Sequence, residues 1–437
     1  MARVAIIFDN IGPYHWARLE AAGRVCDLLA IEVRDNCPEH GWVRQPRQVP
    51  FQTLTLVNVA SGQKPQLGEL TRRLGKVLAE FKPQAVFLPG WFCAAAFVAH
   101  NWCNRNSVPA VVMSESNSWD EKRSALKEWA KRRLTRMYSA ALVGGTTHKN
   151  YMIELGLPAE RVFLGYDAVE NEHFSRKADE VRGQGSEVRN KYGLPERYFL
   201  ASARFIKKKN LPRLFEAFAR YRALAGRSKI EDGRLESGNQ KEDNRLHDNK
   251  TTGLSVVTSP VVRGPVVPWS LVLLGDGPLR SSIFNLRASL GLDAYVHLPG
   301  FKQYDELPVY YSLASAFIHA SSTEQWGLVV NEAMASGLPV LVSNRCGCAM
   351  DLVKDGVNGF TFDPHNIERL ASLMLKISTF NFPLSAFGSE SHSIISNWSV
   401  ERFAQGASAA VEEALKVGAL RTSFFDNVLL RFLAMVK

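Results

Sequence analysis

Short apolar runs alternate along this chain with longer stretches in which apolar residues recur at every third or fourth position. The first run, 3–8, is followed by the strand-breaking residues 9–13 and then by the periodic stretch 14–29. Short apolar runs predict buried strands, and the longer spacing predicts amphipathic helices. Because the alternation continues through most of the chain, it predicts an α/β fold with doubly wound parallel sheets.

The alternation falls into two series. Strands are predicted in the first series at 3–8, 28–33, 51–57, 85–88, 108–113, 140–143 and 162–165, and in the second at 198–203, 269–274, 296–298, 316–320 and 340–342. The main helices are predicted at 14–29, 66–81, 119–138, 211–224, 366–377 and 398–416. We therefore expect an N-terminal unit with its linker at 1–197, a second unit at 198–397, and C-terminal helices at 398–437 that pack back on the body.

Four segments lack this regular pattern. The polar residues 170–197 are predicted to be a linker, and residues 381–397 are predicted to be irregular. Residues 226–268 are polar and without periodicity, which predicts a disordered surface insertion. The apolar-rich segment 420–437 is interrupted by charges. A helix packed on the body, or one lying on a membrane surface, is therefore expected there instead of a membrane span.

The composition is that of an ordinary globular protein, because 46% of its 437 residues are hydrophobic and 22% are charged. No apolar run has membrane-spanning length, and the run that ends at Phe8 is followed at once by Asp9, so no signal peptide is expected. The six cysteines lack the spacing of a disulfide framework or a zinc site. We therefore expect a cytosolic protein with free thiols.

Part of the net charge of +10 is concentrated between residues 122 and 136. Besides the acid Glu128, this segment holds seven basic residues: Lys122, Arg123, Lys127, Lys131, Arg132, Arg133 and Arg136. Its apolar residues are predicted to share one helical face: Leu126, Trp129, Ala130, Leu134 and Met137. The favoured interpretation is the solvated side of a docked helix, and the alternative is contact with an anionic membrane surface or an acidic acceptor. Nucleic acid is not expected as a partner, since no nucleic-acid-binding module accompanies the charge.

Two carboxylates, Glu324 and Glu332, lie eight positions apart, one after a predicted strand and one in the helix that follows. In an open parallel sheet, ligands bind at the carboxyl ends of the strands, where Glu324 would lie. The helix start at Gly327 and Leu328 would point free N–H groups into the same crevice, which favours a phosphate. One carboxylate beside such a phosphate can accept the hydroxyls of a ribose, and the other those of a sugar. As isolated residues, both would instead be ordinary surface groups.

Other candidate residues follow predicted strands. The basic loop 204–210 lies between a strand and a helix, which is a suitable position for binding a diphosphate, although an exposed basic turn is the alternative. In the first loop of the chain, Gly12 allows close approach of the backbone. His15, at the start of the next helix, is a candidate sugar-contacting or acid–base group. The polar cluster 114–117, which contains Glu115, ends another strand and is expected to line the crevice from its other side.

The order of these motifs resembles that of the retaining nucleotide-sugar glycosyltransferases of family four, the group 1 glycosyl transferases, which have the GT-B fold. A single pair of glutamates at this spacing is unspecific, but the ordered set of motifs is specific. The resemblance is strong over about 198–403 and looser in the N-terminal half. It is carried by Arg204 and Lys209, the segment 273–278, Gly300 and Phe301, Glu324 and Glu332, the segment 337–340, Gly347, and Asn358 with Gly359.

The resemblance implies two Rossmann-like units facing a central cleft, with the acceptor bound by 1–197 and the nucleotide-sugar by 198–397. Arg204 and Lys209 would bind the diphosphate and neutralise the leaving group, while Glu332 would hold the ribose and Glu324 the transferred sugar. Glu324, Arg204 and Lys209 would thus be the catalytic residues. Further contacts with the donor are implied for Gly12, Phe301, Gly327 and Leu328.

The implied reaction is retaining transfer of a sugar from a nucleotide-diphospho-sugar to a glycan or lipid-linked saccharide. It would proceed by front-side attack, with the donor phosphate helping to deprotonate the acceptor, and it would need no metal or other cofactor. The sequence contains no Asp-x-Asp pair, which would have suggested the metal-dependent alternative fold.

Two positions depart from the family pattern. Where many members have a histidine after a strand of the first unit, this chain has Ser114 and Glu115. Glu115 or His15 is therefore the candidate group on the acceptor side, unless none is needed. Asp351 stands where the family usually has glutamate.

Two other functions stay open, a non-catalytic GT-B protein that binds nucleotide-sugar or serves as a partner subunit, and a nucleotide-sugar epimerase. A peripheral place on the inner face of the membrane is the alternative to a freely cytosolic one.

Overall fold

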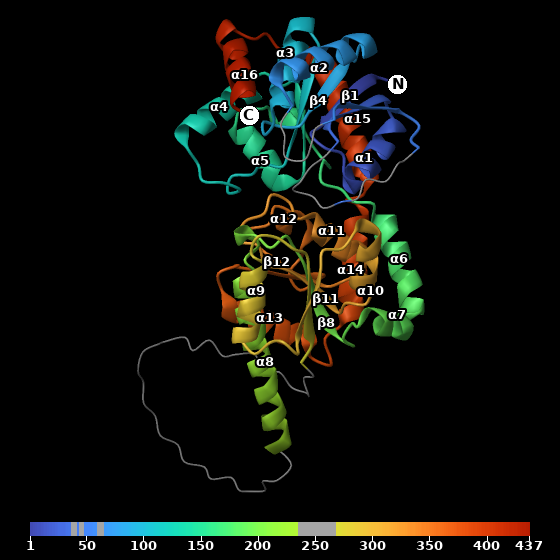
Figure 1. Ribbon diagram of the computed structural model, residues 1–437, viewed down its shortest axis with the longest axis vertical. Coiled ribbons are helices and arrows are strands. Elements are labelled where there is room, and N and C mark those ends of the chain that lie inside the picture. Colours follow the sequence, from blue (N-terminus) through green and yellow to red (C-terminus); the bar gives the residue numbers. More distant parts are fainter. Residues whose placement is uncertain (36–41, 43–47, 59–64, 235–267) are drawn as a thin grey trace, which may run out of the picture.

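The computed structural model describes residues 1–35, 42, 48–58, 65–234 and 268–437. They form two α/β units, one above the other in Figure 1, and each is built around a parallel sheet. Most of the predicted insertion 226–268 lies outside the described residues. Its first part, 226–234, continues the helix α8 (Leu211–Arg234) and is therefore regular, contrary to the prediction.

The N-terminal unit contains a seven-stranded sheet in the order β3-β2-β1-β4-β5-β6-β7. Its strands are β1 (Arg3–Phe8), β2 (Asp27–Arg34), β3 (Gln52–Val57), β4 (Ala85–Leu88), β5 (Ala110–Ser114), β6 (Ala140–Val143) and β7 (Val162–Leu164). The helices around it are α1 (Pro13–Gly23), α2 (Leu67–Phe81), α3 (Ala94–Asn106), α4 (Ala125–Thr135) and α5 (Thr146–Glu154). Strands β4 and β6 are apolar and buried at every position, because helices cover both faces of the sheet.

The second unit contains a six-stranded parallel sheet in the order β10-β9-β8-β11-β12-β13. Its strands are β8 (Tyr198–Ser202), β9 (Ser270–Leu274), β10 (Val296–Gly300), β11 (Ala316–His319), β12 (Val340–Ser343) and β13 (Gly359–Phe362). Its helices include α9 (Arg280–Ser289), α10 (Leu307–Ser312), α11 (Leu328–Ala335), α12 (Ala349–Leu352) and α13 (Ile367–Ser378) besides α8. The predicted α/β fold of two Rossmann-like units is confirmed.

The helix α15 (Val400–Val417) carries the chain back from the second unit to the first. Its buried side chains, among them Phe403 and Val411, share a hydrophobic core with Ile6 of β1 and Leu142 of β6. The last helix, α16 (Phe424–Val436), packs on α3 of the same unit. The N-terminal unit is thus completed by residues from the other end of the sequence (Figure 1).

The prediction of a linker at 170–197 is wrong. This segment forms the helices α6 (Asn171–Gly183) and α7 (Gly185–Tyr192), and α6 packs on the second unit against α10 and α11. The helix buries Phe174 and Ala178 and exposes mainly polar residues. Since so little of α6 enters the core, the hydrophobic pattern was too weak to predict it.

The prediction of irregular structure at 381–397 is also wrong, because a helix, α14 (Leu384–Ser396), occupies most of this segment. Serine and glycine lower its intrinsic helix propensity, and packing against α11 compensates. The basic helix predicted at 119–138 is shorter, since α4 begins at Ala125. Its predicted apolar face is divided, because Leu134 enters the core whereas Leu126 and Trp129 are exposed.

Candidate functional site

Loops at the carboxyl ends of both sheets contact one another between the two units, at the place where the sequence predicts the ligand-binding crevice. The turn that follows β11 contains Glu324 and Gln325, and it is held by side chains of the N-terminal unit. The Asn117 side-chain amide donates to the carbonyl oxygens of Glu324, at 3.4 Å, and Gln325, at 3.2 Å. The Nε2 atom of His148, on α5, lies 3.0 Å from the same Gln325 oxygen. Asn117, from the polar cluster 114–117, is thus buried in a contact with the second unit.

The start of α5 makes a second contact across the crevice. The backbone N–H of Thr146 donates to a carboxylate oxygen of Asp351 at 2.9 Å, and its hydroxyl donates to the other oxygen at 2.5 Å. The Thr147 hydroxyl donates to the carbonyl oxygen of Gly347 at 3.3 Å. Asp351, which the sequence marked only as a departure from the family pattern, therefore caps a helix of the opposite unit.

Glu324 lies at the centre of a buried charged cluster. Only 8% of its surface is exposed. Its carboxylate forms an ion pair with the Nζ atom of Lys209, a longer one of 3.5 Å with Lys208, and a contact of 3.4 Å with His319 Nε2. The hydroxyl of Ser321 donates to the same carboxylate at 3.3 Å. Two of the predicted site residues, Glu324 and Lys209, are thus in direct contact.

The charges of this cluster shift the ionisation of its members. Burial alone would raise the pKa of Glu324, but the ammonium group of Lys209 and the imidazole of His319 lower this pKa well below its usual range. Burial lowers the pKa of His319. Glu324 is therefore a carboxylate at neutral pH, and His319 is an uncharged imidazole beside it.

The loop from residue 345 to residue 348 fixes the turn that carries Glu324. The N–H of Glu324 donates to the carbonyl of Arg345 at 3.0 Å, and the N–H of Gly347 donates to the carbonyl of Glu324 at 3.2 Å. A Cβ atom at Gly347 would clash with the carbonyl oxygen of Gln325, so this close packing needs glycine. Gly327, with φ of +107°, precedes the first residue of α11, Leu328.

Glu332 lies on α11 and is completely buried. Its carboxylate accepts one hydrogen bond from the hydroxyl of Tyr14 on α1 and another, of 2.6 Å, from the hydroxyl of Tyr311 on α10. Burial raises the pKa of Glu332 to about 7, although both hydrogen bonds act in the opposite direction. Because Tyr14 belongs to the N-terminal unit, this hydrogen bond also connects the two units across the crevice.

Aromatic rings from both units meet beside Glu332. The ring of Tyr14 lies edge-on to that of Tyr304, with centroids 5.4 Å apart, and Trp42 lies 5.2 Å from Phe301. Phe301 keeps 41% of its surface exposed at the edge of this group. The predicted donor residue Phe301 thus lies where the two units approach one another.

The remaining predicted residues have different surroundings. Arg204 is exposed, in the loop after β8 that also leads to Lys209. The Nδ1 atom of His15 accepts a hydrogen bond of 3.0 Å from the N–H of Gly12, which helps to cap α1. A Cβ at Gly12 would meet only ordinary van der Waals contacts, so the packing of the described residues does not itself require glycine there.

Glu115 lies after β5, and Asp167 lies after β7. Burial raises the pKa of Glu115, and burial together with the Glu115 carboxylate raises the pKa of Asp167 well above its usual range. The guanidinium of Arg18 opposes both shifts. The shared cause of both shifts is burial, and the proximity of the two carboxyl groups adds to the shift of Asp167.

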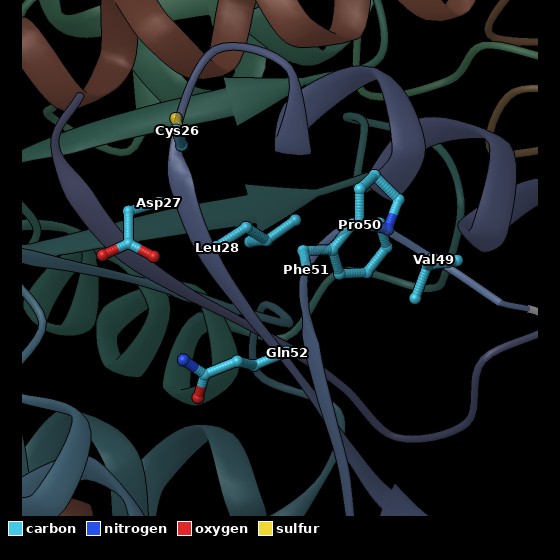
Figure 2. A pocket seen from close by; sticks show the side chains of 7 residues that line it. All are labelled: Cys26, Asp27, Leu28, Val49, Pro50, Phe51 and Gln52. Atoms are coloured by element: carbon cyan, nitrogen blue, oxygen red, sulfur yellow. The ribbon is translucent and has the colours of Figure 1, made fainter.

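A hollow of about 330 Å³ lies at the amino ends of β2 and β3. Figure 2 shows the side chains that line it. It is lined by Cys26, Asp27, Leu28, Val49, Pro50, Phe51 and Gln52. Ligands of open parallel sheets bind at the carboxyl ends of the strands, which is the opposite edge of this sheet. Burial raises the pKa of the Cys26 thiol, so this cysteine is not a thiolate nucleophile at neutral pH.

Within the described residues, no three His, Cys, Asp or Glu side chains lie close enough together to hold a metal ion. The five cysteines among these residues have free thiols. None of the helices in the described part of the chain is both long and apolar enough to cross a membrane.

Part of the second unit is similar in sequence to a known protein family. A model of the family described as glycosyl transferases group 1 matches residues 261–384, which include both Glu324 and Glu332. Over 93 residues the chain is 37% identical to the alpha-monoglucosyldiacylglycerol synthase of Acholeplasma laidlawii, covering 21% of this chain and 23% of that protein. Over 115 residues it is 30% identical to a GDP-mannose-dependent alpha-(1-6)-phosphatidylinositol monomannoside mannosyltransferase of Mycobacterium tuberculosis, covering 25% of this chain and 30% of that protein. The chain thus matches less than a third of the length of these two relatives.

Comparison with solved structures extends the similarity to both units. Sucrose-phosphate synthase from Thermosynechococcus elongatus superposes with a TM-score of 0.66 at 16% identity, covering 93% of this chain and 97% of that one. Anabaena HepE in complex with UDP and glucose superposes with a TM-score of 0.64 at 18% identity, covering 93% and 98%. These structures establish the GT-B fold. Together with the family model and the sequence relatives, they support a glycosyltransferase.

Several residues of the site were not recognisable from the sequence. Tyr14 and Tyr311 lie in apolar helical segments, where their pattern is that of core residues. His148 follows a pair of glycines after a strand, a position that is a weak signal for a site. His319 lies within a predicted strand and could not be distinguished from a core residue. Lys208, in contrast, belongs to the basic loop 204–210 that was predicted to suit a diphosphate.

Proposed function

We propose that this protein is a retaining glycosyltransferase that moves a sugar from a nucleotide-diphospho-sugar to a glycan or lipid-linked saccharide. The observation that carries the proposal is the Lys209–Glu324 ion pair, which is buried at the crevice between two GT-B units. A cation for a diphosphate and a carboxylate for sugar hydroxyls are thereby brought to one place. The carboxylate, Glu324, lies within the segment that matches the glycosyl transferases group 1 model.

The diphosphate would lie between the basic loop after β8 and the start of α11. Lys208 and Lys209, with Arg204 from the same loop, would neutralise the two phosphates, and the N–H groups after Gly327 would add a positive helix end. As the bond from sugar to phosphate breaks, negative charge grows on the leaving oxygen. Fixed ammonium groups in a crevice with little water stabilise that charge more than water does.

The other donor contacts follow from the positions of the carboxylates. Glu332 would accept the ribose hydroxyls, and the base would pack beside Phe301, with Gly12 leaving room for the donor on the opposite side. Glu324 would accept hydroxyls of the transferred sugar. The Glu324 carboxylate is held by Lys209 and Ser321, so it is ionised and oriented by the protein itself.

The course of the reaction is proposed from the same residues. Glu115, a buried carboxyl group with a raised pKa, is the candidate group on the acceptor side, while His15 is engaged with Gly12. Attack from the same face as the leaving group would preserve the anomeric configuration, with the donor phosphate taking the acceptor proton. We propose that no resident metal takes part, because lysines supply the positive charge at the diphosphate.

The acceptor class and the location in the cell are likewise proposals. Two relatives are named for activities on diacylglycerol and phosphatidylinositol derivatives, which supports a lipid-linked acceptor. HepE, whose fold this chain shares, was solved with UDP and glucose, which makes UDP-glucose the first donor to test. We propose a cytosolic protein that works at the inner face of a membrane.

The test is a thermal-shift screen of UDP-, GDP- and ADP-sugars, followed by analysis of the products. One donor is expected to raise the melting temperature, since a ligand that binds only the folded state stabilises it. With an acceptor present, NMR of the product is expected to show retained anomeric configuration. Binding without transfer or hydrolysis would instead support a non-catalytic protein, and interconversion of nucleotide-sugars would support an epimerase.

Tyr14→Phe is expected to tighten the binding of the donor about threefold to tenfold. The Tyr14 hydroxyl donates to a Glu332 oxygen that the ribose would need, so the donor would have to displace it. Isothermal titration with the nucleoside diphosphate measures the effect. Tyr311→Phe is the matched control, because it removes the other hydrogen bond to Glu332 from inside the second unit and leaves the competing Tyr14 hydroxyl in place. Weaker binding by Tyr14→Phe would contradict the proposed displacement.

A further inference from the structure

The outer side of α16 carries an exposed apolar stripe. Phe425, Val428, Phe432 and Met435 recur at intervals of three and four positions and therefore lie on one face of the helix. Their exposed fractions are 72%, 47%, 56% and 66%, and the neighbouring Phe424 is 77% exposed. Large exposed apolar patches in proteins mark interaction sites.

The inner side of α16 explains why this stripe keeps its position. Leu430 is fully buried and Ala434 nearly so, and both belong to the core that α3 shares with the N-terminal sheet. The helix also begins with a capping box, since the Ser423 hydroxyl accepts from the N–H of Asp426, and Asp426 accepts from the N–H of Ser423. The helix is thus fixed to the body, and its apolar outer face is a rigid part of the surface.

Helix α4 extends this surface. The Arg133 side chain joins the two helices, because its Nε donates to Asp426 at 2.7 Å and its Nη2 donates to Ser423 at 3.2 Å. Figure 1 shows α4 and α16 on the same side of the N-terminal unit. On α4, Leu126 and Trp129 are 74% and 54% exposed. We refer to α16, the exposed side of α4 and the exposed residues that flank these two helices, 121–124, 136, 421 and 423, together as the docking surface.

The charges on the docking surface are predominantly positive. Some basic side chains of the segment 122–136 are neutralised locally, because Lys127 and Lys131 both pair with Glu121. Five other basic side chains are exposed and have no ion pair within the described part of the chain: Lys122, Arg132, Arg136, Arg421 and Arg431. The acid of α16, Asp426, is paired with Arg133.

We propose that the docking surface binds an anionic phospholipid bilayer. Aromatic and aliphatic side chains on one helical face, bordered by arginine and lysine, suit the boundary between lipid headgroups and acyl chains. The excess of unpaired cations matches anionic headgroups, which attract basic segments close to a membrane. The sequence suggested that the whole segment 122–136 contacts a membrane. In this proposal only the exposed residues of that segment do so, and the apolar side chains of α16 anchor the protein in the bilayer.

This proposal rests on the membrane location in the proposed function and names the surface that makes the contact. Because the surface lies outside the crevice and is tested without donor or acceptor, its failure is distinguishable from failure of the proposed sugar transfer. The purified full chain is mixed with vesicles of phosphatidylcholine, with or without phosphatidylglycerol, and the bound fraction is measured by sedimentation. Binding is expected with phosphatidylglycerol, and it is expected to weaken as salt screens the charges. Phe425→Ser/Phe432→Ser is expected to lower the partition coefficient about tenfold or more. Arg132→Glu/Arg136→Glu is expected to lower it by a similar factor on anionic vesicles alone.

Matched variants separate this surface from general effects. Phe380→Ser removes an equally exposed phenylalanine from the second unit, and Arg72→Glu/Lys76→Glu reverses two exposed charges on α2. Both are expected to bind as the wild type does. Circular dichroism and melting curves check that every variant is folded, which exposed substitutions should permit.

Three results would overturn the proposal. The first is failure of the wild type to bind anionic vesicles, and the second is unchanged binding by both docking-surface variants. The third is a concentration-dependent dimer that Phe425→Ser/Phe432→Ser dissociates while vesicle binding persists, because the surface would then be an interface between two copies of the chain.

Discussion

Lys209→Ala is expected to lower kcat/KM for sugar transfer roughly 10²- to 10³-fold while the protein stays folded. Lys209 forms the buried ion pair with Glu324 and, in the proposed function, neutralises the leaving diphosphate. Removing one group that stabilises charge in the transition state typically costs a factor of this size. Steady-state kinetics with the donor found in the screen measures the loss, and the melting temperature shows whether the fold has survived.

The loop supplies its own control. Lys207 lies two residues earlier at an exposed position, so Lys207→Ala removes the same charge from the same loop and is expected to leave kcat/KM nearly unchanged.

The contributions of Lys209 and Glu324 to catalysis should also be coupled, because the two side chains are in contact. The double variant Lys209→Ala/Glu324→Gln is therefore expected to lose less kcat/KM than the product of the two single losses. Activity of Lys209→Ala above a tenth of the wild-type value would remove this residue from the mechanism.

The free energy of unfolding is expected to fall by about 3 kcal/mol between pH 4.5 and pH 7 because of Glu332 alone. Burial raises the pKa of this group from its usual 4.5 to about 7 in the folded protein. Between these two pH values the folded state binds more protons at Glu332 than the unfolded state does. The stabilising contribution of Glu332 is therefore greatest below pH 4.5 and is lost as the pH rises through 7. Urea denaturation at a series of pH values measures the slope.

Glu332→Gln isolates this contribution. The amide keeps the shape of the side chain but does not titrate, so the difference in slope between variant and wild type belongs to Glu332. Other buried carboxyl groups with raised pKa values, such as Glu115 and Asp167, titrate in both proteins and cancel in the comparison. Identical slopes in the two proteins would mean that Glu332 does not titrate with a raised pKa.

The two predictions examine different parts of the crevice. The first tests the interaction of Lys209 and Glu324 with the diphosphate and the transferred sugar. The second tests the free-energy cost of keeping the Glu332 carboxylate buried between two tyrosines. In the proposed function the burial of Glu332 favours binding of the donor, because a carboxylate without water around it gains more from hydrogen bonds with ligand hydroxyls. The Tyr14 hydroxyl takes the place of such a ligand hydroxyl until the donor arrives.

Local sequence patterns accounted for most of the fold. Buried strands such as β4 and β6 are apolar at every position, and that pattern was recognised without tertiary information. The pattern failed where helices bury few side chains, as in α6, or contain poor helix formers, as in α14. In both cases packing against the rest of the second unit stabilises a helix that its own residues barely specify.

The sequence by itself determined the two parallel-sheet units and the loops in which the carboxylates and lysines occur, because strand and helix periods are local properties and ligands bind where parallel strands end. Only the tertiary structure decided which of these groups meet. It paired Lys209 with Glu324, placed Tyr14 of the first unit on Glu332 of the second, and joined Arg133 to Asp426 from the far end of the chain. Such pairings depend on how segments that are distant in sequence pack together in three dimensions. Local periodicity contains no information about that packing.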